Sequence, residues 1–110
     1  MLNIAVLVSG GGTNLQALLD SEARGENPSG KIRLVVASKP GVYALERAAN
    51  AGVEGVVVRR KDYASSEEFD AALLKTLKEH NIDLVVLAGF LSVLGPSVIE
   101  AYPRRILNIH

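Results

Sequence analysis

Two polar side chains, at positions 108 and 110, could take part in the transfer of an acyl or formyl group. Asn108 and His110 are separated by one residue, so on a β-strand both side chains would lie on the same face of the sheet. An imidazole exchanges a proton near neutral pH, and a carboxamide N–H can donate to an oxyanion as it forms. Together they suit attack of an amine on a carbonyl carbon. The alternative is a frayed polar end of the chain without a chemical role.

A glycine-rich segment, residues 9–14 with the sequence SGGGTN, is a candidate phosphate site. Small residues let the backbone approach a ligand, and the free N–H groups at the start of a helix favour a bound anion. Thr13 and Asn14 add a hydroxyl and an amide as further donors, or either could serve only to cap the helix. A tight turn that needs glycine is the other interpretation.

The glycine segment does not fit two familiar nucleotide motifs. A dinucleotide fingerprint that begins at Gly10 requires Gly or Ala where Leu15 stands, and an acidic residue near residues 37–39, where the sequence is ASK. A P-loop requires a lysine after the glycines, and none occurs between Met1 and Arg24. NAD and ATP are therefore disfavoured, and the segment suits a phosphate monoester such as a sugar phosphate, held mostly by neutral donors.

Composition limits the classes of function. The 110 residues are 48% hydrophobic and 22% charged, which is typical of one globular domain. Twelve basic and twelve acidic residues give no net charge, so nothing indicates a general nucleic-acid or membrane binder. The chain has no Cys and only two His, which gives little basis for a metal. The apolar run at residues 4–8 is too short for a membrane span and lacks signal-peptide features, so we expect a cytoplasmic protein.

Short apolar runs alternate with amphipathic stretches, a pattern typical of buried parallel strands between helices. Strands are predicted at residues 2–8, 32–37, 55–58, 84–88 and 105–109, and helices at 14–24, 42–51, 65–80 and 96–102. Right-handed crossovers favour an α/β fold with an open, doubly wound, mostly parallel, Rossmann-like sheet in strand order 3-2-1-4-5. The functional crevice would lie at the carboxyl ends of the first and fourth strands, beside residues 9–14, 89–96 and 108–110.

Several residues set the predicted helix ends. Ser65 or Ser66, followed by two glutamates, predicts a capped start of the third helix. Gly52 predicts a left-handed stop after the second helix, and residues 25–30, with Pro28 among them, end the first. His80 falls in the last turn of the third helix, where a favourable interaction with the helix dipole explains it better than catalysis.

Three motifs, in this order, resemble the phosphoribosylglycinamide formyltransferases, the glycinamide ribonucleotide transformylases of purine synthesis. They are SGGGTNLQ at residues 9–16, LAGFLSVLGP at residues 87–96 and LNIH at residues 107–110. The resemblance extends over the whole chain. It implies transfer of a formyl group from 10-formyltetrahydrofolate, as co-substrate, to the amine of glycinamide ribonucleotide in de novo IMP synthesis.

The resemblance also implies a role for each motif. Gly12, Thr13 and Asn14 would hold the substrate phosphate. The pteridine pocket of the folate would be lined by Leu91, Ser92, Val93 and Leu94, with Asn108 also in contact. Asn108 and His110 would be two members of an Asn, His, Asp catalytic set. The implied reaction is direct attack of the amine on the formyl carbon, without a covalent enzyme intermediate.

The sequence departs from the family at two positions. Some members carry Arg where Ser66 and Ser92 stand here, so contact with the folate tail is left open. Arg59, Arg60 and Lys61 lie nearby, although such a run is often a solvated turn, and residues 91–94 could be ordinary core.

The resemblance implies that residues 1–110 are the amino-terminal, phosphate-binding portion of a formyltransferase domain. The catalytic Asp and the folate-covering half would follow His110. We therefore expect this portion alone to be inactive and to expose an apolar edge at Ile106, Leu107 and Ile109. Whether the assembly is a homodimer is left open.

Other functions fit parts of the pattern. Formyltetrahydrofolate deformylases and methionyl-tRNA formyltransferases share the Asn-x-His ending. The deformylases carry a preceding domain, whereas Met1 directly precedes the first strand here, and the tRNA enzymes lack this glycine loop. A non-catalytic module for a phosphorylated ligand would explain the glycine loop but would leave Asn108 and His110 without a purpose.

Overall fold

The computed structural model describes residues 1–26 and 29–109. The elements follow in the order β1 (Leu2–Val8), α1 (Thr13–Ala23), β2 (Gly30–Ala37), α2 (Tyr43–Asn50), β3 (Glu54–Val57), η1 (Arg60–Asp62), α3 (Ser66–Glu79), β4 (Leu84–Ala88), α4 (Pro96–Ala101) and β5 (Ile106–Ile109). All strand pairings are parallel, in the order β3-β2-β1-β4-β5. The predicted fold class and strand order are confirmed, and the short 3₁₀ turn η1 is the element that the sequence did not predict.

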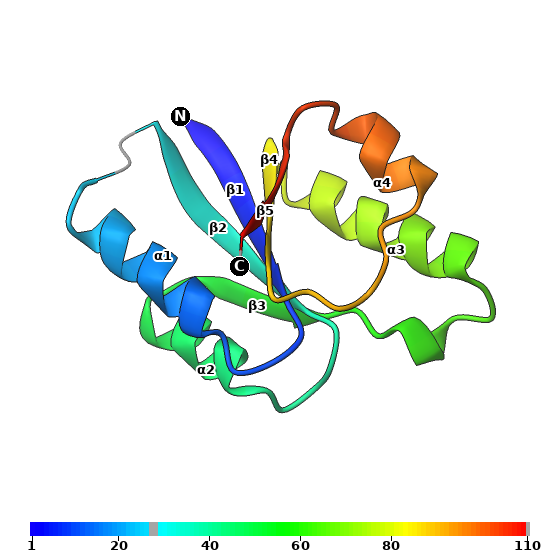
Figure 1. Ribbon diagram of the computed structural model, residues 1–110, viewed down its shortest axis with the longest axis horizontal. Helices are drawn as coiled ribbons and strands as arrows, with labels where there is room; N and C mark the ends of the chain where they lie inside the picture. The colour runs from blue at the N-terminus through cyan, green and yellow to red at the C-terminus, as the bar shows by residue number, and fades with distance from the viewer. Residues whose placement is uncertain (27–28, 110) are drawn as a thin grey trace.

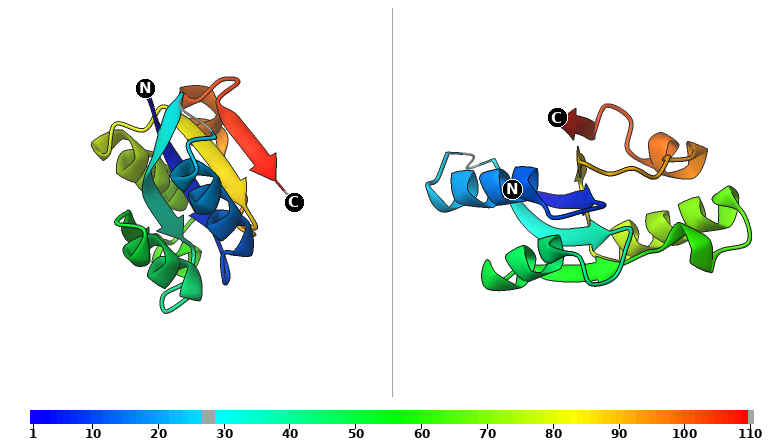
Figure 2. Two further views of the ribbon diagram at one scale, coloured as in Figure 1. Left: turned by 90° about the vertical axis from the view of Figure 1, so that its left-hand side faces the viewer. Right: turned by 60° about the horizontal axis from the view of Figure 1, so that its bottom comes forward.

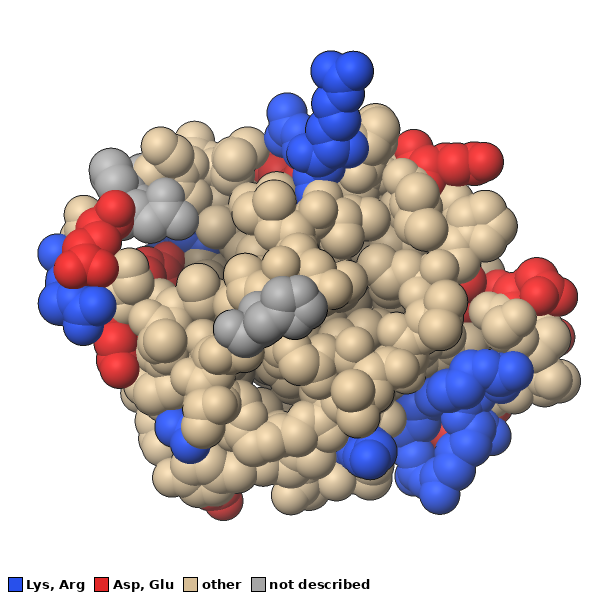
Figure 3. Space-filling view, in the orientation of Figure 1, with Lys and Arg blue, Asp and Glu red and all other residues tan. Residues whose placement is uncertain are grey.

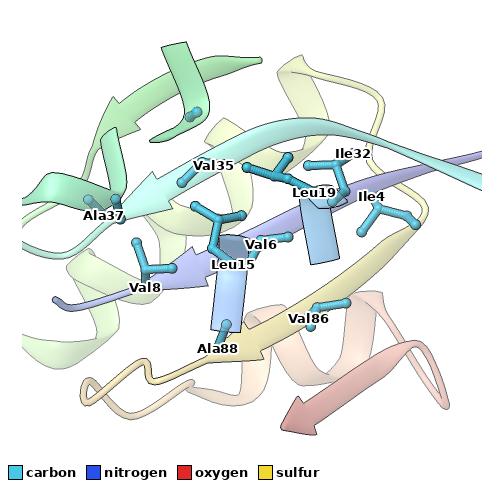
Figure 4. Close-up of a cluster of buried hydrophobic side chains, with 12 residues drawn as sticks. Ile4, Val6, Val8, Leu15, Leu19, Ile32, Val35, Ala37, Val86 and Ala88 are labelled. Carbon is cyan, nitrogen blue, oxygen red and sulfur yellow. The ribbon is translucent and has the colours of Figure 1, made fainter. Parts of the chain in front are cut away.

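The helices cover both faces of the sheet, α1 and α2 on one and α3 and α4 on the other (Figures 1 and 2). The central strand β1 supplies side chains to both layers by simple alternation. Ile4, Val6 and Val8 pack under α1 and α2 (Figure 4), while Ala5 and Leu7 pack under α3 and α4. This double burial explains the continuous apolar run in β1, because a strand covered on both faces has no polar side.

At the edge of the sheet opposite β3, β5 is the outer strand beside β4 (Figure 2). An apolar pocket of about 150 Å³ lies between α1 and strands β1, β2, β4 and β5, and Leu107 and Ile109 are part of its lining. Leu107 is 51% exposed, whereas Ile106 and Ile109 are half-buried. The expected apolar edge is therefore present, mainly at Leu107.

The start of α3 agrees with the predicted cap. Ser65 Oγ accepts a hydrogen bond from the N–H of Glu68 at 3.1 Å, and the Glu68 carboxylate accepts one from the N–H of Ala64 at 3.0 Å. Gly52 has the predicted left-handed conformation, with φ of +75°. The start of α1 is different, because Gly12 is the N-cap and no side chain caps the helix. The predicted stop at residues 25–30 includes Pro28, which lies outside the described residues.

His80 links the end of α3 to the start of β3. Its Nδ1 lies 2.8 Å from the Thr76 carbonyl oxygen, and its Nε2 lies 2.9 Å from Glu54 Oε2. The Thr76 carbonyl, followed by the Glu54 carboxylate, raises the pKa of His80. The dipole interpretation is thus incomplete, because Glu54 is a specific partner that lies 26 residues away in the sequence.

Asp70 connects α3 to α4. The side chain is buried, and its two carboxylate oxygens accept hydrogen bonds from the N–H groups of Gly95 and Ser97, each at 2.8 Å, and of Val98 at 3.3 Å. These N–H groups form the first turn of α4, so a carboxylate on one helix caps the next. At Gly95 a Cβ atom would lie 2.7 Å from Asp70 Cγ, and this contact requires glycine.

We predict that His80→Gln removes a pH-dependent part of the stability. A pKa raised in the folded state adds stability below the unfolded pKa of about 6.5, and this contribution disappears as the pH rises through the folded pKa. In urea unfolding, the loss caused by His80→Gln should be larger at about pH 5.5 than at about pH 8.5. The control Lys75→Gln should shift the curve little at either pH, and a loss of equal size at both pH values for His80→Gln would contradict the prediction.

Asp70→Asn should destabilise the protein by about 2 kcal/mol. In the unmodified protein both carboxylate oxygens accept from backbone N–H groups, whereas in the variant an NH₂ group replaces one of these oxygens and faces another donor. Equilibrium urea unfolding measures this difference. The exposed replacement Asp20→Asn on α1 is the matched control, with an expected effect below about 0.5 kcal/mol. Equal stabilities of the two variants would show that the cap of α4 is unimportant.

Candidate active site at the carboxyl edge of the sheet

The loops that follow β1, β2 and β4 meet at one buried hydroxyl. Ser9 directly follows β1 and is 5% exposed. Its Oγ accepts a hydrogen bond from the backbone N–H of Leu91 at 2.8 Å and one from the Ser38 hydroxyl at 2.7 Å. Figure 1 shows the three loops together below the strands. Sequence reasoning included Ser9 only as the start of the glycine segment; the available signal was a small polar residue directly after the apolar run at residues 4–8.

The glycine loop is shaped by its contact with α2. Gly12 has φ of +81°, and a Cβ atom there would lie 2.8 Å from the Cβ of Ala44. Glycine is thus required both by the backbone conformation and by the close approach of α2. At Gly10 and Gly11 an added Cβ would meet nothing within 4 Å, so the other side of the loop is open to a ligand.

Arg47 on α2 fixes the outer part of the glycine loop, and sequence reasoning did not identify it. Its Nε donates to the Gly11 carbonyl at 2.8 Å and its Nη1 donates to Gln16 Oε1 at 3.2 Å. The guanidinium also lies over the Tyr43 ring, 4.7 Å from the centroid. A positive charge therefore stands beside the candidate phosphate site.

Thr13 and Asn14 lie at the start of α1, where Thr13 is exposed and Asn14 is half-buried. The prediction that one of them caps the helix is wrong, because Gly12 is the N-cap.

The segment after β4 is held at both ends and exposed between them. Ser9 binds the N–H of Leu91, and Asp70 binds the N–H of Gly95. Leu91 and Val93 are 80% and 85% exposed, so the alternative that residues 91–94 are ordinary core is wrong for these two. Ser92 and Leu94 are half-buried, and Leu94 packs against the α3 layer. The exposed apolar side chains could contact an apolar ligand.

Asn108 is exposed on β5, in register with Leu87 of β4. Its neighbours Leu107 and Ile109 line the apolar pocket on the α1 face. Side chains alternate along a strand, so Asn108 points to the α3 and α4 face, as Ile106 does. Asn108 lies at the same carboxyl edge of the sheet as the glycine loop, and among the described residues its side chain makes no hydrogen bond. His110 lies outside the described residues.

A pocket of about 490 Å³ opens beyond the carboxyl ends of four strands. Its lining consists of Ser9, residues 38–40, residues 59–61 and residues 91–92. The run at residues 59–61 passes into η1, where Arg60 and Lys61 are exposed as in a solvated turn, and it also forms one wall of this pocket. The predicted strand order places the carboxyl end of β3 beside that of β2, but the spacing of residues 59–61 gives no signal that they line a pocket.

Two further kinds of site are absent from the described part of the chain. In residues 1–26 and 29–109, no group of three or more His, Asp or Glu side chains could hold a metal ion. Within the same ranges, no helix is long and apolar enough to cross a membrane.

Known proteins resemble this chain over its whole length. The phosphoribosylglycinamide formyltransferase of Haemophilus influenzae is 40% identical over 110 residues, which cover 100% of this chain and 51% of that protein. The trifunctional purine biosynthetic protein adenosine-3 of Drosophila melanogaster is 44% identical, over 97% of this chain and 8% of that protein. The crystal structure of glycinamide ribonucleotide transformylase 1 from Symbiobacterium toebii has a TM-score of 0.95 and 44% identity, covering 100% of this chain and 51% of that one.

The chain thus spans about half the length of the bacterial formyltransferase that it matches. A family model described as formyl transferase matches residues 2–110. This match covers nearly the whole sequence, and the solved structure above has the same fold. The chain therefore belongs to the formyl transferase family.

Proposed function

We propose that the protein containing this chain transfers a formyl group from 10-formyltetrahydrofolate to the amine of glycinamide ribonucleotide, in purine biosynthesis. The observation that carries the proposal is the placement of the glycine loop, residues 91–94 and Asn108 at one edge of one sheet. Two ligands can meet at such an edge, which is where ligands bind in open α/β sheets. The name of the Haemophilus influenzae relative, a phosphoribosylglycinamide formyltransferase, supports the choice of the acceptor and of the formyl group as the group transferred.

In this proposal the glycine loop binds the substrate phosphate. The backbone N–H groups at the start of α1, the Thr13 hydroxyl and the Asn14 amide are the donors, and Gly12 permits the loop to adopt this shape. Arg47, held against Gly11 at 2.8 Å, adds a positive charge behind the loop. Residues 91–94 contact the pteridine of the folate, with exposed Leu91 and Val93 as the apolar surface.

Asn108 and His110 act on the carbonyl that is transferred. The amine nitrogen forms a bond to the formyl carbon, and the carbon–oxygen double bond becomes an oxyanion. The Asn108 amide donates to that oxygen, which stabilises the developing charge. His110 accepts a proton from the attacking amine and returns it to the folate nitrogen as the bond from that nitrogen to the formyl carbon breaks. The amide oxygen of Asn108 can also accept a hydrogen bond from the folate.

We predict that Asn108→Ala lowers kcat by about 10²–10³-fold and that His110→Ala lowers it by about 10²–10⁴-fold. The measurement is formyl transfer to glycinamide ribonucleotide by the full-length protein, monitored through the absorbance of the folate product. Asn50→Ala, at the exposed end of α2, and His80→Gln are the matched controls and should retain kcat. An unchanged kcat for His110→Ala would exclude His110 from the chemical step, whereas the absence of formyl transfer by the unmodified protein would favour a non-catalytic module for a phosphorylated ligand.

Thr13→Val should raise KM for glycinamide ribonucleotide about tenfold and leave kcat nearly unchanged, because the loss of one hydrogen bond to a charged phosphate affects ground state and transition state alike. Steady-state kinetics at saturating folate measures the split. Thr76→Val, on α3, removes a hydroxyl far from this edge and serves as the control. A fall in kcat at constant KM would place Thr13 in the chemical step and not in phosphate binding.

The nature of the acceptor distinguishes this proposal from the related reactions. Release of formate from the folate without an amine substrate would identify a deformylase, and formylation of methionyl-tRNA would identify the tRNA enzyme. We expect both rates to be negligible beside transfer to glycinamide ribonucleotide, measured with the same preparation.

A further inference from the structure

We propose that Ser9 is a positioning residue for formyl transfer, which sets the place of one bound substrate relative to the other. Its backbone begins the glycine loop, and its hydroxyl oxygen holds the segment that follows β4 through the N–H of Leu91. The inference rests on the proposed function, in which the glycine loop binds the phosphate and residues 91–94 bind the folate. It assigns Ser9 an effect on the rate without a part in the chemistry.

The two candidate substrate sites diverge beyond the ends of their strands. The pairing of β1 with β4 ends at Leu7 and Leu87, and past these residues the ladder no longer holds the two loops together. Within the described part of the chain, one hydrogen bond joins the glycine loop to the segment between β4 and α4, from the N–H of Leu91 to Ser9 Oγ at 2.8 Å. A single side chain therefore connects the two sites.

Ser9 is one of two buried polar side chains that hold the same segment. Apart from the aromatic Tyr102, Ser9 and Asp70 are the buried polar or charged side chains among the residues that the structure describes, 5% and 2% exposed. Ser9 binds the N–H of Leu91, and Asp70 binds the N–H of Gly95. Burial of a polar side chain is costly unless it is hydrogen-bonded, and here both side chains bond to one exposed segment. Their shared effect is to specify where that segment lies.

The side chain of Ser9 is itself fixed by Ser38. The backbone N–H of Ser38 donates to the Val8 carbonyl at 3.0 Å, which extends the ladder between β1 and β2 by one residue. The Ser38 hydroxyl lies 2.7 Å from Ser9 Oγ and is hydrogen-bonded to it. The sheet thus determines where Ser38 lies, Ser38 orients Ser9, and Ser9 places Leu91.

The segment has no side-chain charge that could replace these hydrogen bonds. Residues 89–95, with the sequence GFLSVLG, are all uncharged. On the face shown in Figure 3, charged side chains lie mainly around the margin, and few lie over the middle, where the chain passes from β4 toward α4 in Figure 1. Phe90 and Leu94 pack against the α3 layer, but apolar contacts are not directional. The exact place of the segment therefore depends on the hydrogen bonds at its ends.

A shift of this segment relative to the glycine loop would change the distance between the amine nitrogen and the formyl carbon. The reacting atoms must lie about 3–3.5 Å apart, and a misplacement of about 1 Å can lower the rate about 10²-fold. Each substrate would still meet its own contacts, because the phosphate donors and the side chains of Leu91 and Val93 are retained. Loss of the Ser9 hydroxyl should thus lower kcat with little change in either KM.

The test compares Ser9→Ala with the unmodified full-length protein. We expect kcat for formyl transfer to fall about tenfold or more, with each KM changed less than about threefold and the shape of the pH profile of kcat retained. Ser38→Ala removes the orienting hydroxyl but leaves the bond to Leu91, so it should lower kcat about threefold. This variant also keeps the inference testable if Ser9→Ala does not fold. The matched control, Ser21→Ala, removes a hydroxyl of α1 that donates to Glu26 at 2.9 Å and should retain kcat.

Amide hydrogen exchange, measured by NMR, tests the connection in the absence of both substrates. In Ser9→Ala the N–H of Leu91 should exchange at least about tenfold faster, whereas the N–H of Gly95, bound by Asp70, should keep its rate. Unchanged exchange at Leu91 would overturn the inference, and so would an unchanged kcat or a rise in the folate KM alone. An unmodified protein that transfers no formyl group would contradict the proposed function, and the exchange at Leu91 would then decide whether Ser9 places the segment.

Discussion

The position of β1 in the middle of the sheet is the constraint on which the other features depend. The chain leaves β1 toward β2 on one side and returns to β4 on the other, so the loops after β1 and β4 diverge and a crevice opens between them. Ser9 stands where they part, and its hydroxyl receives hydrogen bonds from the loop on each side. The glycine loop and the exposed apolar segment both follow from that divergence.

In the glycine loop, the local backbone conformation and the packing of a distant helix both require glycine at position 12. The left-handed conformation of Gly12 turns the chain into α1, and the same residue gives Ala44 of α2 room to approach. Arg47, one turn along α2, then holds the Gly11 carbonyl. The second helix is thus a support for the loop as well as a cover for the sheet, and a small residue at position 44 is part of the site's construction.

The fold could be predicted from the sequence far better than the site. Strands β1 and β4 begin and end where their apolar runs do, whereas β2 begins at Gly30, earlier than its apolar run, because Lys31 and Arg33 alternate with buried residues. The 3₁₀ turn was not predicted because residues 59–62, with the sequence RRKD, include no apolar residue that would show a periodic pattern. Contacts between distant residues, such as those of His80 with Glu54 and of Ser9 with Leu91, have no signal in local spacing. The face on which Asn108 lies follows from its strand, but its role remains a proposal.

The segment between β4 and α4 is anchored at Leu91 by one buried side chain and at Gly95 by another. Only three residues lie between the anchors, so the backbone there has little conformational freedom to lose when something binds. The exposed leucine and valine side chains on this short segment form a preorganised apolar surface. Association with it carries a small entropic penalty, and more of the contact energy can therefore appear as affinity.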